Sequence, residues 1–475
     1  MVKRLHYIFN VRLLLFLLCS GGMTVNAQWV TIPDAHFVTY LQSAIPAAMS
    51  GNQMDTTSPG VTTTTQRIDV SHKIIANLYG IQFFSSLKYL NCQNDSIVTF
   101  PAFPNTLDTL VCDTNKITGF TTFPNSLMYL TCRDNHLTGL PAFPSSISYI
   151  DCRLNHINSL PALPASLIYL DCSQNIQFTL PTLPLNMQVL RCDWNQLTGL
   201  PALPSTLQTL SCYDNLSLSV IPALPPAMTY LNCADNSVSV LPALPSLLST
   251  LHCEGNSLSN LPALPNALSV LYCDFNNIPS LPVLPSSLTY LYCSNNIIAK
   301  IPALPASLST LVCGTNHLDS LPVLPNGLTY LDCIHNNIHC FPYFPHSITT
   351  IRIDPNPYAC LPDFIPALGA DTVSHRVCAP NNLYNCSFSN GNGIQVWSGY
   401  DHQLAVYPNP SSSGVFTLSD EQVIDWVSIT NVVGQIIDQY APHVQTLNLQ
   451  IEKKGIYFIT VGVNSRITTC KVVVN

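Results

Sequence analysis

One unit of 20 residues recurs through most of this chain, from about residue 85 to residue 356. Aligned copies give the pattern LxxLxCxxNxLxxLPxLPxx. Its cysteine falls at positions 92, 112, 132, 152, 172, 192, 212, 233, 253, 273, 293, 313 and 333. One copy is longer by a residue, which a stack of coils accommodates because each coil contacts only its neighbours. Self-similarity at this period predicts a solenoid whose coils share one continuous core.

The composition fits an ordered repeat and excludes several classes of partner. Proline is common, with 38 residues, but the hydrophobic fraction of 47% is too high for a disordered proline-rich chain. Only 9% of the residues are charged and the formal net charge is −8, without any basic run. Neither a nucleic acid nor an anionic membrane is therefore expected as a partner. No apolar run of the chain is long enough to predict a transmembrane segment.

The repeat predicts where each of its side chains points. Side chains of a strand alternate between faces, so in one copy Leu210 and Cys212 point inward while Thr209, Ser211 and Tyr213 point outward. The two prolines of LPxLP lack an N–H and have a fixed φ, which favours an extended, polyproline-like convex wall. A helix is not expected there.

An asparagine follows the cysteine by three residues in the aligned copies. Its amide both donates and accepts hydrogen bonds, so it can satisfy backbone groups of its own turn and of the next. We expect a buried structural ladder rather than a catalytic feature. Its predicted members include Asn115, Asn135, Asn155, Asn195, Asn236, Asn256, Asn276, Asn296, Asn316 and Asn336.

The pattern resembles the signature LxxLxLxxNxL of the leucine-rich-repeat family, with cysteine in place of the third strand leucine. The resemblance covers about two thirds of the chain, and the LPxLP half is similar to the short repeats of certain Gram-negative secreted effectors. It implies a horseshoe solenoid of mostly β and irregular structure, with about fourteen coils and a parallel β-sheet on the concave side.

Nineteen cysteines in an exported protein would ordinarily suggest a disulfide framework. Those of the repeat stand at an inward leucine position with parallel side chains, so we expect buried free thiols. A metal ladder is the alternative, but the repeat lacks the local ligand pairs of zinc sites. Cys340, Cys360, Cys378 and Cys386 lie beyond the ladder and are candidates for disulfides. The preferred pairing is Cys340–Cys360 with Cys378–Cys386.

The beginning of the chain predicts an export signal. Lys3, Arg4 and Arg12 accompany a short apolar run, and a small-residue cleavage site follows at Ala27. Residues 1–27 are therefore predicted to be a signal peptide. Lipidation of Cys19 is the alternative, although bulky leucines precede that residue where a lipobox has small ones.

Both ends of the array are expected to carry caps, since a terminal coil would otherwise expose its core. Residues 28–66 are predicted to form the N-terminal cap, and their segment 32–41 has helical apolar spacing similar to that of caps in exported leucine-rich-repeat proteins. This cap carries too few carboxylates for a calcium site. The array is expected over 67–360, a C-terminal cap over 361–390 and a linker over 391–404.

A different pattern begins at Tyr407-Pro408-Asn409-Pro410 and predicts a small Ig-like β-sandwich over residues 405–475. The expected strands are Gly414–Leu418, Trp426–Thr430, Gly455–Val461 and Thr469–Val474. With its YPNP start and the turn at 431–435, this tail resembles the type A C-terminal sorting domain of the type IX secretion system. The resemblance implies recognition by that machinery, passage across the outer membrane and removal of the tail, followed by attachment to lipopolysaccharide or release.

The outward strand positions supply candidate ligand-binding residues for the concave face. Tyr and Trp give large, stiff contact areas and Arg gives planar hydrogen bonding, as in binding hot spots. A tyrosine column can equally stack on itself as cross-strand pairs. The candidates are Tyr129, Arg133, Tyr149, Asp151, Arg153, Tyr169, Asp171, Arg191, Asp193, Trp194, Tyr213, Tyr230, His252, Tyr272, Tyr290 and Tyr292.

The sequence does not favour an enzyme. It contains no GxSxG, HExxH, P-loop or GxGxxG in the required context, and no cofactor or metal site is expected. Asp151 and Asp171, one coil apart, resemble a carboxylate pair, but we expect them to be solvated. The prediction is a secreted or surface-attached, adhesin-like protein that binds a protein or glycan. A self-associating structural surface protein is the alternative. A host-directed effector fits less well, because similar effectors lack an N-terminal export signal.

Overall fold

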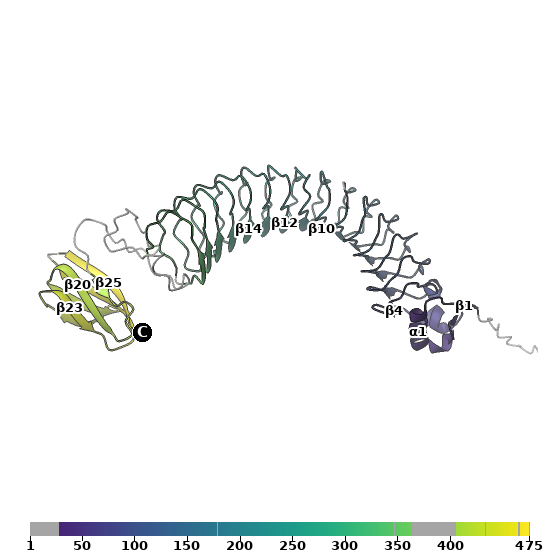
Figure 1. Ribbon diagram of the computed structural model, residues 1–475, viewed down its shortest axis with the longest axis horizontal. Coiled ribbons are helices and arrows are strands. Elements are labelled where there is room, and N and C mark those ends of the chain that lie inside the picture. The colour runs from purple at the N-terminus through teal and green to yellow at the C-terminus, as the bar shows by residue number, and fades with distance from the viewer. Residues whose placement is uncertain are drawn as a thin grey trace, which may run out of the picture. The chain divides into compact units, whose positions relative to one another are not determined.

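The computed structural model describes residues 28–177, 179–345, 347–362, 405–432, 434–463 and 466–474. They belong to two units, an N-terminal solenoid and a small C-terminal β domain (Figure 1). The predicted signal peptide, the linker 391–404 and nearly all of the predicted C-terminal cap lie outside the described residues. No helix among the described residues is long and apolar enough to cross a membrane.

A small cap precedes the first coil. Its strands β1 (Trp29–Thr31), β2 (Met49–Ser50) and β3 (Gln53–Asp55) form an antiparallel sheet, accompanied by helix α1 (Ala35–Ala44) and the short helices η1 (Pro46–Ala48) and η2 (Gly60–Thr64). Asp34 begins α1: its Oδ1 accepts hydrogen bonds from the N–H groups of His36 and Phe37 at 3.0 Å. Phe37 and Leu41 are buried, so the helix predicted from this apolar spacing is confirmed.

The coils contribute one strand each to a parallel sheet of fifteen strands, arranged in chain order. In Figure 1 this sheet follows the inner side of the solenoid's arc, so the predicted leucine-rich-repeat horseshoe is confirmed. Helix η3 (Ile81–Phe83) lies between the first two strands. The strands are β4 Arg67–Asp69, β5 Tyr89–Asn91, β6 Thr109–Val111, β7 Tyr129–Thr131, β8 Tyr149–Asp151, β9 Tyr169–Asp171, β10 Val189–Arg191, β11 Thr209–Ser211, β12 Tyr230–Asn232, β13 Thr250–His252, β14 Val270–Tyr272, β15 Tyr290–Tyr292, β16 Thr310–Val312, β17 Tyr330–Asp332 and β18 Thr350–Arg352.

The convex wall is irregular, as the LPxLP segments predict. The second proline of a segment ends the wall with a tight turn, in which its carbonyl accepts a hydrogen bond from the N–H three residues later. In one coil the N–H of Leu207 donates to the carbonyl of Pro204 at 3.0 Å. The leucine that donates is fully buried, so this turn brings the chain back into the core just before the next strand.

The ladder asparagines join each coil to the one before it. Asn135 donates through Nδ2 to the carbonyl oxygens of Cys132 and Arg133 in its own coil and of Cys112 in the preceding coil, each at 3.1 Å. Its Oδ1 accepts from the N–H of Ile117 at 3.0 Å. All thirteen asparagines from Asn115 to Asn356 donate in this way to the preceding cysteine carbonyl. Each asparagine thus hydrogen-bonds to its own coil and to the preceding coil. From the sequence we expected bonds to its own turn and to the next turn.

The ladder cysteines are free and buried, as predicted. Their thiols point along the stack and several donate weak hydrogen bonds to a carbonyl of the following coil, for example Cys112 to Thr131 at 3.2 Å. Burial raises the pKa of these thiols, to about 12 for Cys233. They therefore stay protonated and do not act as nucleophiles. Cys340 and Cys360 are disulfide-bonded. Cys378 and Cys386 lie outside the described residues. The predicted pairing of Cys340 with Cys360 and of Cys378 with Cys386 therefore stays a prediction.

The C-terminal unit consists of two antiparallel sheets. One contains β19 (Ala405–Tyr407), β20 (Val415–Ile424) and β23 (Val444–Gln450), and the other contains β22 (Ile436–Tyr440), β21 (Trp426–Asn431), β24 (Gly455–Val463) and β25 (Arg466–Val474), in that order. Phe416, Leu418, Ile429, Ile459 and Val472 belong to its core. The four predicted strands are present. The sequence missed β19, β22 and β23; β22 is almost entirely exposed and therefore lacks an alternating pattern.

Gln177 is an irregularity in the core. It occupies the place of Leu197 and is completely buried, and its amide lies beside the Cys172 thiol. Apart from this contact with the thiol, neither polar atom of the amide has a hydrogen-bond partner among the described residues. A buried unsatisfied amide costs about 1–3 kcal/mol.

We therefore expect Gln177→Leu to raise the free energy of unfolding by about 1–3 kcal/mol, measured by urea denaturation. Gln196→Leu changes an exposed glutamine of the next coil and serves as the control. A stability gain no larger than that of the control would contradict the interpretation of Gln177.

Asp95 takes the place of the ladder asparagine in the first full coil. Its Oδ1 accepts from the N–H groups of Lys73 at 2.9 Å and Ile75 at 3.0 Å, but its buried Oδ2 has no hydrogen-bond partner in the described part of the chain. Burial raises the pKa of this carboxyl above the ordinary aspartate value. Because the folded pKa exceeds the unfolded one, stability falls as the pH rises through the folded pKa.

Asp95→Asn restores the amide donor and removes the charge. At pH 8 we expect a gain of about 1–2 kcal/mol in the free energy of unfolding, and a smaller gain at pH 4, where the wild-type carboxyl is partly protonated. Urea titrations at the two pH values test this, with the exposed Asp134→Asn as the control. A gain that does not depend on pH would exclude the buried carboxylate as its cause.

Candidate binding surface on the concave sheet

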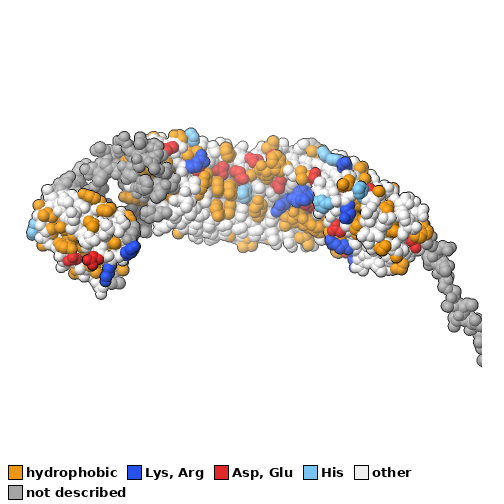
Figure 2. Space-filling model, turned by 60° about the horizontal axis from the view of Figure 1, so that its bottom comes forward, with side chains coloured by type: hydrophobic (Ala, Val, Ile, Leu, Met, Phe, Trp, Pro, Cys, Tyr) orange, Lys and Arg blue, Asp and Glu red, His pale blue; other side chains and the backbone are white. Residues whose placement is uncertain are grey.

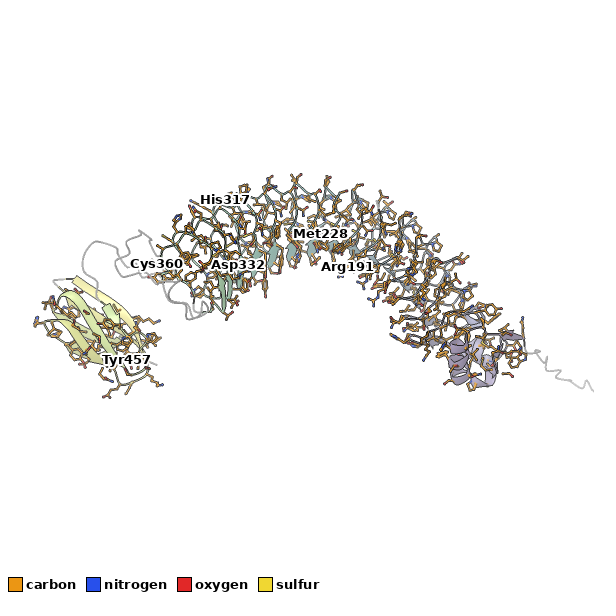
Figure 3. The ribbon with its side chains drawn as sticks, viewed as in Figure 1. Arg191, Met228, His317, Asp332, Cys360 and Tyr457 are labelled. Atoms are coloured by element: carbon orange, nitrogen blue, oxygen red, sulfur yellow. The ribbon has the colours of Figure 1, made fainter. Side chains whose placement is uncertain are left out.

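Two positions of each strand, and the residue after the cysteine, face the inner side of the arc. In Figure 3, Arg191 and Asp332 lie on this side, whereas Met228 lies between the walls of its coil. Charged side chains are sparse along the solenoid in the view of Figure 2. No group of three potential metal ligands occurs within the described ranges.

The tyrosines at the first strand position form a stack. Tyr129 and Tyr149 have ring centroids 4.3 Å apart and Tyr149 and Tyr169 have theirs 4.2 Å apart, with interplanar angles of 12° and 6°. Both faces of Tyr149 are therefore covered by neighbouring rings. Burial and the adjacent tyrosines raise the pKa of Tyr149, so its hydroxyl stays protonated. The stack offers a ligand ring edges and hydroxyl groups.

A second stack occupies the third strand position. His252 lies 4.6 Å from Tyr272, and Tyr272 lies 4.3 Å from Tyr292, again nearly parallel. Tyr230 contacts His252 at a tilt, with 5.8 Å between the ring centroids. Burial raises the pKa of Tyr272 to about 12. Tyr290 stands beside this group and is 44% exposed.

The aspartates of the concave columns accept hydrogen bonds from backbone N–H groups. Asp151 and Asp171 are only 4% and 1% exposed, so the expectation that they are solvated is wrong. Each accepts a hydrogen bond from the N–H of the residue after its cysteine: Arg153 donates to Asp151 at 3.3 Å and Ser173 donates to Asp171 at 3.1 Å. This N–H is left without a regular partner where the chain leaves the sheet.

Asp113 and Asp193 satisfy the same N–H group of the following coil. Arg133 donates to Asp113 at 2.9 Å and Tyr213 donates to Asp193 at 2.8 Å. Ser211 donates a further hydrogen bond to Asp193 at 2.6 Å. Asp113 was not among the candidate residues predicted from the sequence. The signal that could have found it is the frequency of Asp and Asn on either side of the cysteine, because the side-chain oxygens of these residues readily accept from backbone N–H groups in turns.

Arg153 neutralises the two buried aspartates. Its guanidinium nitrogens lie 3.1 Å from Asp151 and 3.4 Å from Asp171. Burial, followed by the charge of Asp171, nevertheless raises the pKa of Asp151 to about 6. Arg153, Asp151 and Asp171 thus bind one another and nearby backbone N–H groups. This arrangement is suited to stabilising the ends of strands β8 and β9 rather than to proton transfer.

Arg191 differs from the other concave arginines. Arg133 pairs with Asp113 at 3.3 Å and Arg352 pairs with Asp332 at 2.8 Å. Arg191 is exposed and forms no ion pair with any described residue. Burial raises the pKa of Tyr169, and the charge of Arg191 opposes this increase.

Trp194 projects from the turn beside Arg191. It is 50% exposed and makes an edge contact with Tyr213, with 5.4 Å between the ring centroids. Its φ of 53° is left-handed, like that of the equivalent residue in neighbouring coils. A bulky residue is uncommon in this conformation. Tyr169, Arg191, Trp194 and Tyr213, here called the Arg191 patch, are thus brought together by β9, β10 and the turns that follow β10 and β11.

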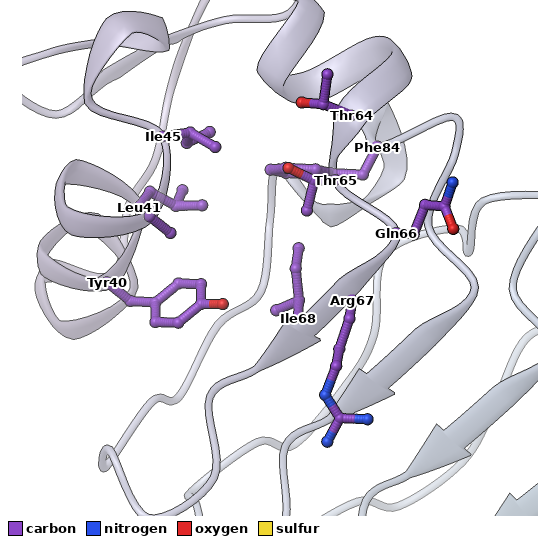
Figure 4. Close-up of a pocket in the computed structure, with 10 residues that line it drawn as sticks. Tyr40, Leu41, Ile45, Thr64, Thr65, Gln66, Arg67, Ile68 and Phe84 are labelled. Atoms are coloured by element: carbon purple, nitrogen blue, oxygen red, sulfur yellow. The ribbon is translucent and has the colours of Figure 1, made fainter.

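A cavity in the described part of the chain lies away from this surface. It lies in the N-terminal cap between α1 and β4 (Figure 4). The concave sheet is open, so a ligand would contact it over an area and not inside a pocket.

Comparison with known proteins gives two similarities. Residues 405–475 match the family described as secretion system C-terminal sorting domain. Among solved structures, a leucine-rich effector protein, YopM from Yersinia pestis, has 29% identity and a TM-score of 0.54, covering 61% of this chain and 88% of that one. YopM from Yersinia enterocolitica has 34% identity and a TM-score of 0.49, covering 57% and 69%.

The functional domain of InlJ from Listeria monocytogenes, which includes a cysteine ladder, has 18% identity and a TM-score of 0.47, covering 94% of this chain and 99% of that one. No curated protein matches the chain significantly. The two resemblances inferred from the repeat and from the tail are confirmed.

Arg153→Met should destabilise the solenoid in a pH-dependent way. At pH 8 both aspartates would be charged and buried without a counter-ion, and we expect a loss of about 3 kcal/mol in the free energy of unfolding. At pH 5 the loss should be smaller, because Asp151, whose folded pKa is already raised to about 6, is protonated there. Chemical denaturation at both pH values measures the difference.

Arg133→Met is the matched control for this prediction. It removes an arginine with a single carboxylate partner, so its effect should be smaller. Equal losses for Arg153→Met at pH 5 and pH 8 would show that the arginine acts through packing rather than through the buried charges.

Proposed function

Because this chain is a leucine-rich-repeat protein that ends in a secretion sorting domain, we propose that it is an exported binding protein whose ligand docks on the concave sheet. The sorting domain implies secretion or a place at the cell surface. The finer steps are part of the proposal: recognition of this domain by the type IX machinery, its removal, and attachment to surface lipopolysaccharide or release.

The observation that supports the concave site best is the unpaired charge of Arg191. Burying a guanidinium is unfavourable unless a ligand supplies hydrogen-bond acceptors, and an exposed one is available for bidentate contacts. The other concave arginines already have carboxylate partners at 2.8–3.4 Å. The guanidinium of Arg191 is therefore available to bind an acidic group of a partner.

The neighbours of Arg191 complete a binding hot spot. Trp194 offers an exposed indole held against Tyr213, and Tyr169 offers its hydroxyl edge at the end of the tyrosine stack. Trp, Tyr and Arg are the residues most enriched in hot spots. The patch lies near the middle of the array, where a ligand can contact strands on both sides.

A protein ligand fits this surface better than a glycan. Sugars stack on the faces of aromatic rings, but both faces of Tyr149 and of Tyr272 are covered by neighbouring rings at 4.2–4.6 Å. The two stacks therefore expose ring edges and hydroxyl groups, which suit hydrogen bonding to polar protein side chains. Enzyme activity is not part of the proposal, since Asp151 and Asp171 are engaged by Arg153.

The test is ligand capture with the full chain, from cell lysate and on a glycan array. We expect the double variant Arg191→Ala and Trp194→Ala to weaken capture at least about tenfold, because two hot-spot contacts are lost. Its melting temperature should stay unchanged, since Arg191 and Trp194 are exposed and Arg191 makes no ion pair with the described residues.

The control variant is Arg352→Ala with Phe275→Ala. Arg352 holds the strand position of Arg191 but is paired with Asp332, and Phe275 holds the turn position of Trp194 and is 63% exposed. The control should capture the ligand like the wild type. Unchanged capture by the Arg191 variant would reject the site. Capture of nothing but further copies of this chain would favour a self-associating surface protein instead.

A further inference from the structure

The four-stranded sheet of the C-terminal unit, β22-β21-β24-β25, has one face on the core of the unit and one face away from it. Val427, Ile459 and Val472 point into the core. The residues between them along each strand point outward, because side chains of a strand alternate between faces. An outer face of this kind is usually polar in an antiparallel sheet. Here only one end of the outer face is polar.

The polar end is closed by contacts within the unit. Its paired residues are Gln439, Ser428, Thr460 and Thr469. The hydroxyl groups of the two threonines lie 2.9 Å apart, and the glutamine amide donates to the serine hydroxyl at 3.5 Å. Beyond this row the indole of Trp426 lies directly over Gly462, where a Cβ would be 2.1 Å from Trp426 Nε1.

The opposite end of the same face is apolar. The outer apolar patch, as we call it, consists of Ile436, Ile456, Phe458 and Val473. Ile436 and Phe458 pair with Thr430 from its two sides, and Ile456 pairs with Val473. Ile436 is 59% exposed and Ile456 is 39% exposed. Single exposed apolar side chains are normal, whereas a contiguous group of them marks an interaction site.

The hairpin between β21 and β22 lies at this apolar end. Its turn at 431–435 is one of the features by which the tail resembles sorting domains. The N–H of Asn431 donates to the carbonyl of Gln435 at 3.0 Å, which closes the turn beside Ile436. Val432 projects from the turn and is 64% exposed. The turn therefore extends the apolar surface.

The rim of the outer apolar patch is positively charged. Lys471 stands in register with Phe458, and Lys453 and Lys454 directly precede β24. All three lysines are exposed, and none forms an ion pair with a described residue. Glu452 is the one carboxylate beside them in the same turn. An excess of positive charge around an apolar centre favours a partner with carboxylates around its own contact surface.

We propose that the outer apolar patch docks on a protein of the secretion machinery, whose contact surface is apolar and flanked by carboxylates. This inference rests on the proposed recognition of the tail by the type IX machinery. The match of residues 405–475 to a secretion system sorting domain gives the class of partner. The apolar side chains form the centre of the contact, and Lys454 and Lys471 face the carboxylates of the partner.

The test is export of the full chain by a bacterium that has the type IX secretion system. Immunoblots of the medium and of protease-treated cells measure the share of the chain that has crossed the outer membrane. We expect Ile436→Ser with Ile456→Ser to lower this share at least about tenfold, because two contacts at the centre of the interface are lost. The melting temperature of the purified variant should stay unchanged, since both side chains are exposed.

A second variant tests the charge of the partner. Lys454→Glu with Lys471→Glu leaves the apolar side chains in place and reverses the rim, so the exported share should fall a few-fold. Val415→Ser with Val444→Ser is the matched control. These valines are 37% and 38% exposed on the other sheet of the unit, and the control should be exported like the wild type.

Deletion of residues 405–475 separates the two levels of the proposal. If the deletion left export unchanged, the proposed recognition of the tail would fail together with this inference. If the deletion abolished export but the Ile436 variant was exported normally, only the docking surface would be wrong. An equal loss in the valine control would also overturn it. So would normal export of an Ile436 variant that had lost wild-type dimers, because the patch would then receive a second copy.

Discussion

The amide of the ladder asparagine is the interaction on which this solenoid depends. After each cysteine the chain turns out of the sheet through a left-handed residue, and several backbone groups lose their regular partners there. One asparagine supplies hydrogen bonds to four of them, as at Asn155, which serves Cys132, Cys152, Arg153 and Leu137. Each buried group left unsatisfied would cost about 1–3 kcal/mol, so no apolar residue can replace the amide at low cost.

The same demand for hydrogen bonds determines which charges remain on the concave surface. The N–H after the cysteine needs an acceptor, and Asp113, Asp151, Asp171 and Asp193 each supply one. These carboxylates then attract the nearby arginines. Arg191 has no such partner among the described residues, and Asp193 of its own coil accepts from Ser211 and the Tyr213 N–H. The surface that remains for a ligand is smaller than the columns of polar residues suggest.

Much of the fold could be predicted from the sequence because the repeat has strict periodicity. The positions of Leu, Cys and Asn define the coil, and their inward direction follows from strand geometry alone. The roles of Arg153 and Arg191 could not be separated in this way. Both are outward-facing arginines near the same edge, and they differ only through the aspartates of neighbouring coils. The sequence could not decide whether the tyrosines stack on one another or remain free for a ligand. Stacking depends on the side-chain rotamers in neighbouring coils.

Amide hydrogen exchange tests the central role of the ladder most directly. The N–H groups of Leu137 and Ile157 donate to Asn155 and Asn175 at 3.0 and 2.9 Å. The account predicts that these two amides exchange as slowly as the amide of Leu170 in strand β9, because they open only when the coils separate. If they exchanged as rapidly as the amide of the exposed Ala162 on the convex wall, the ladder would not hold the coils together.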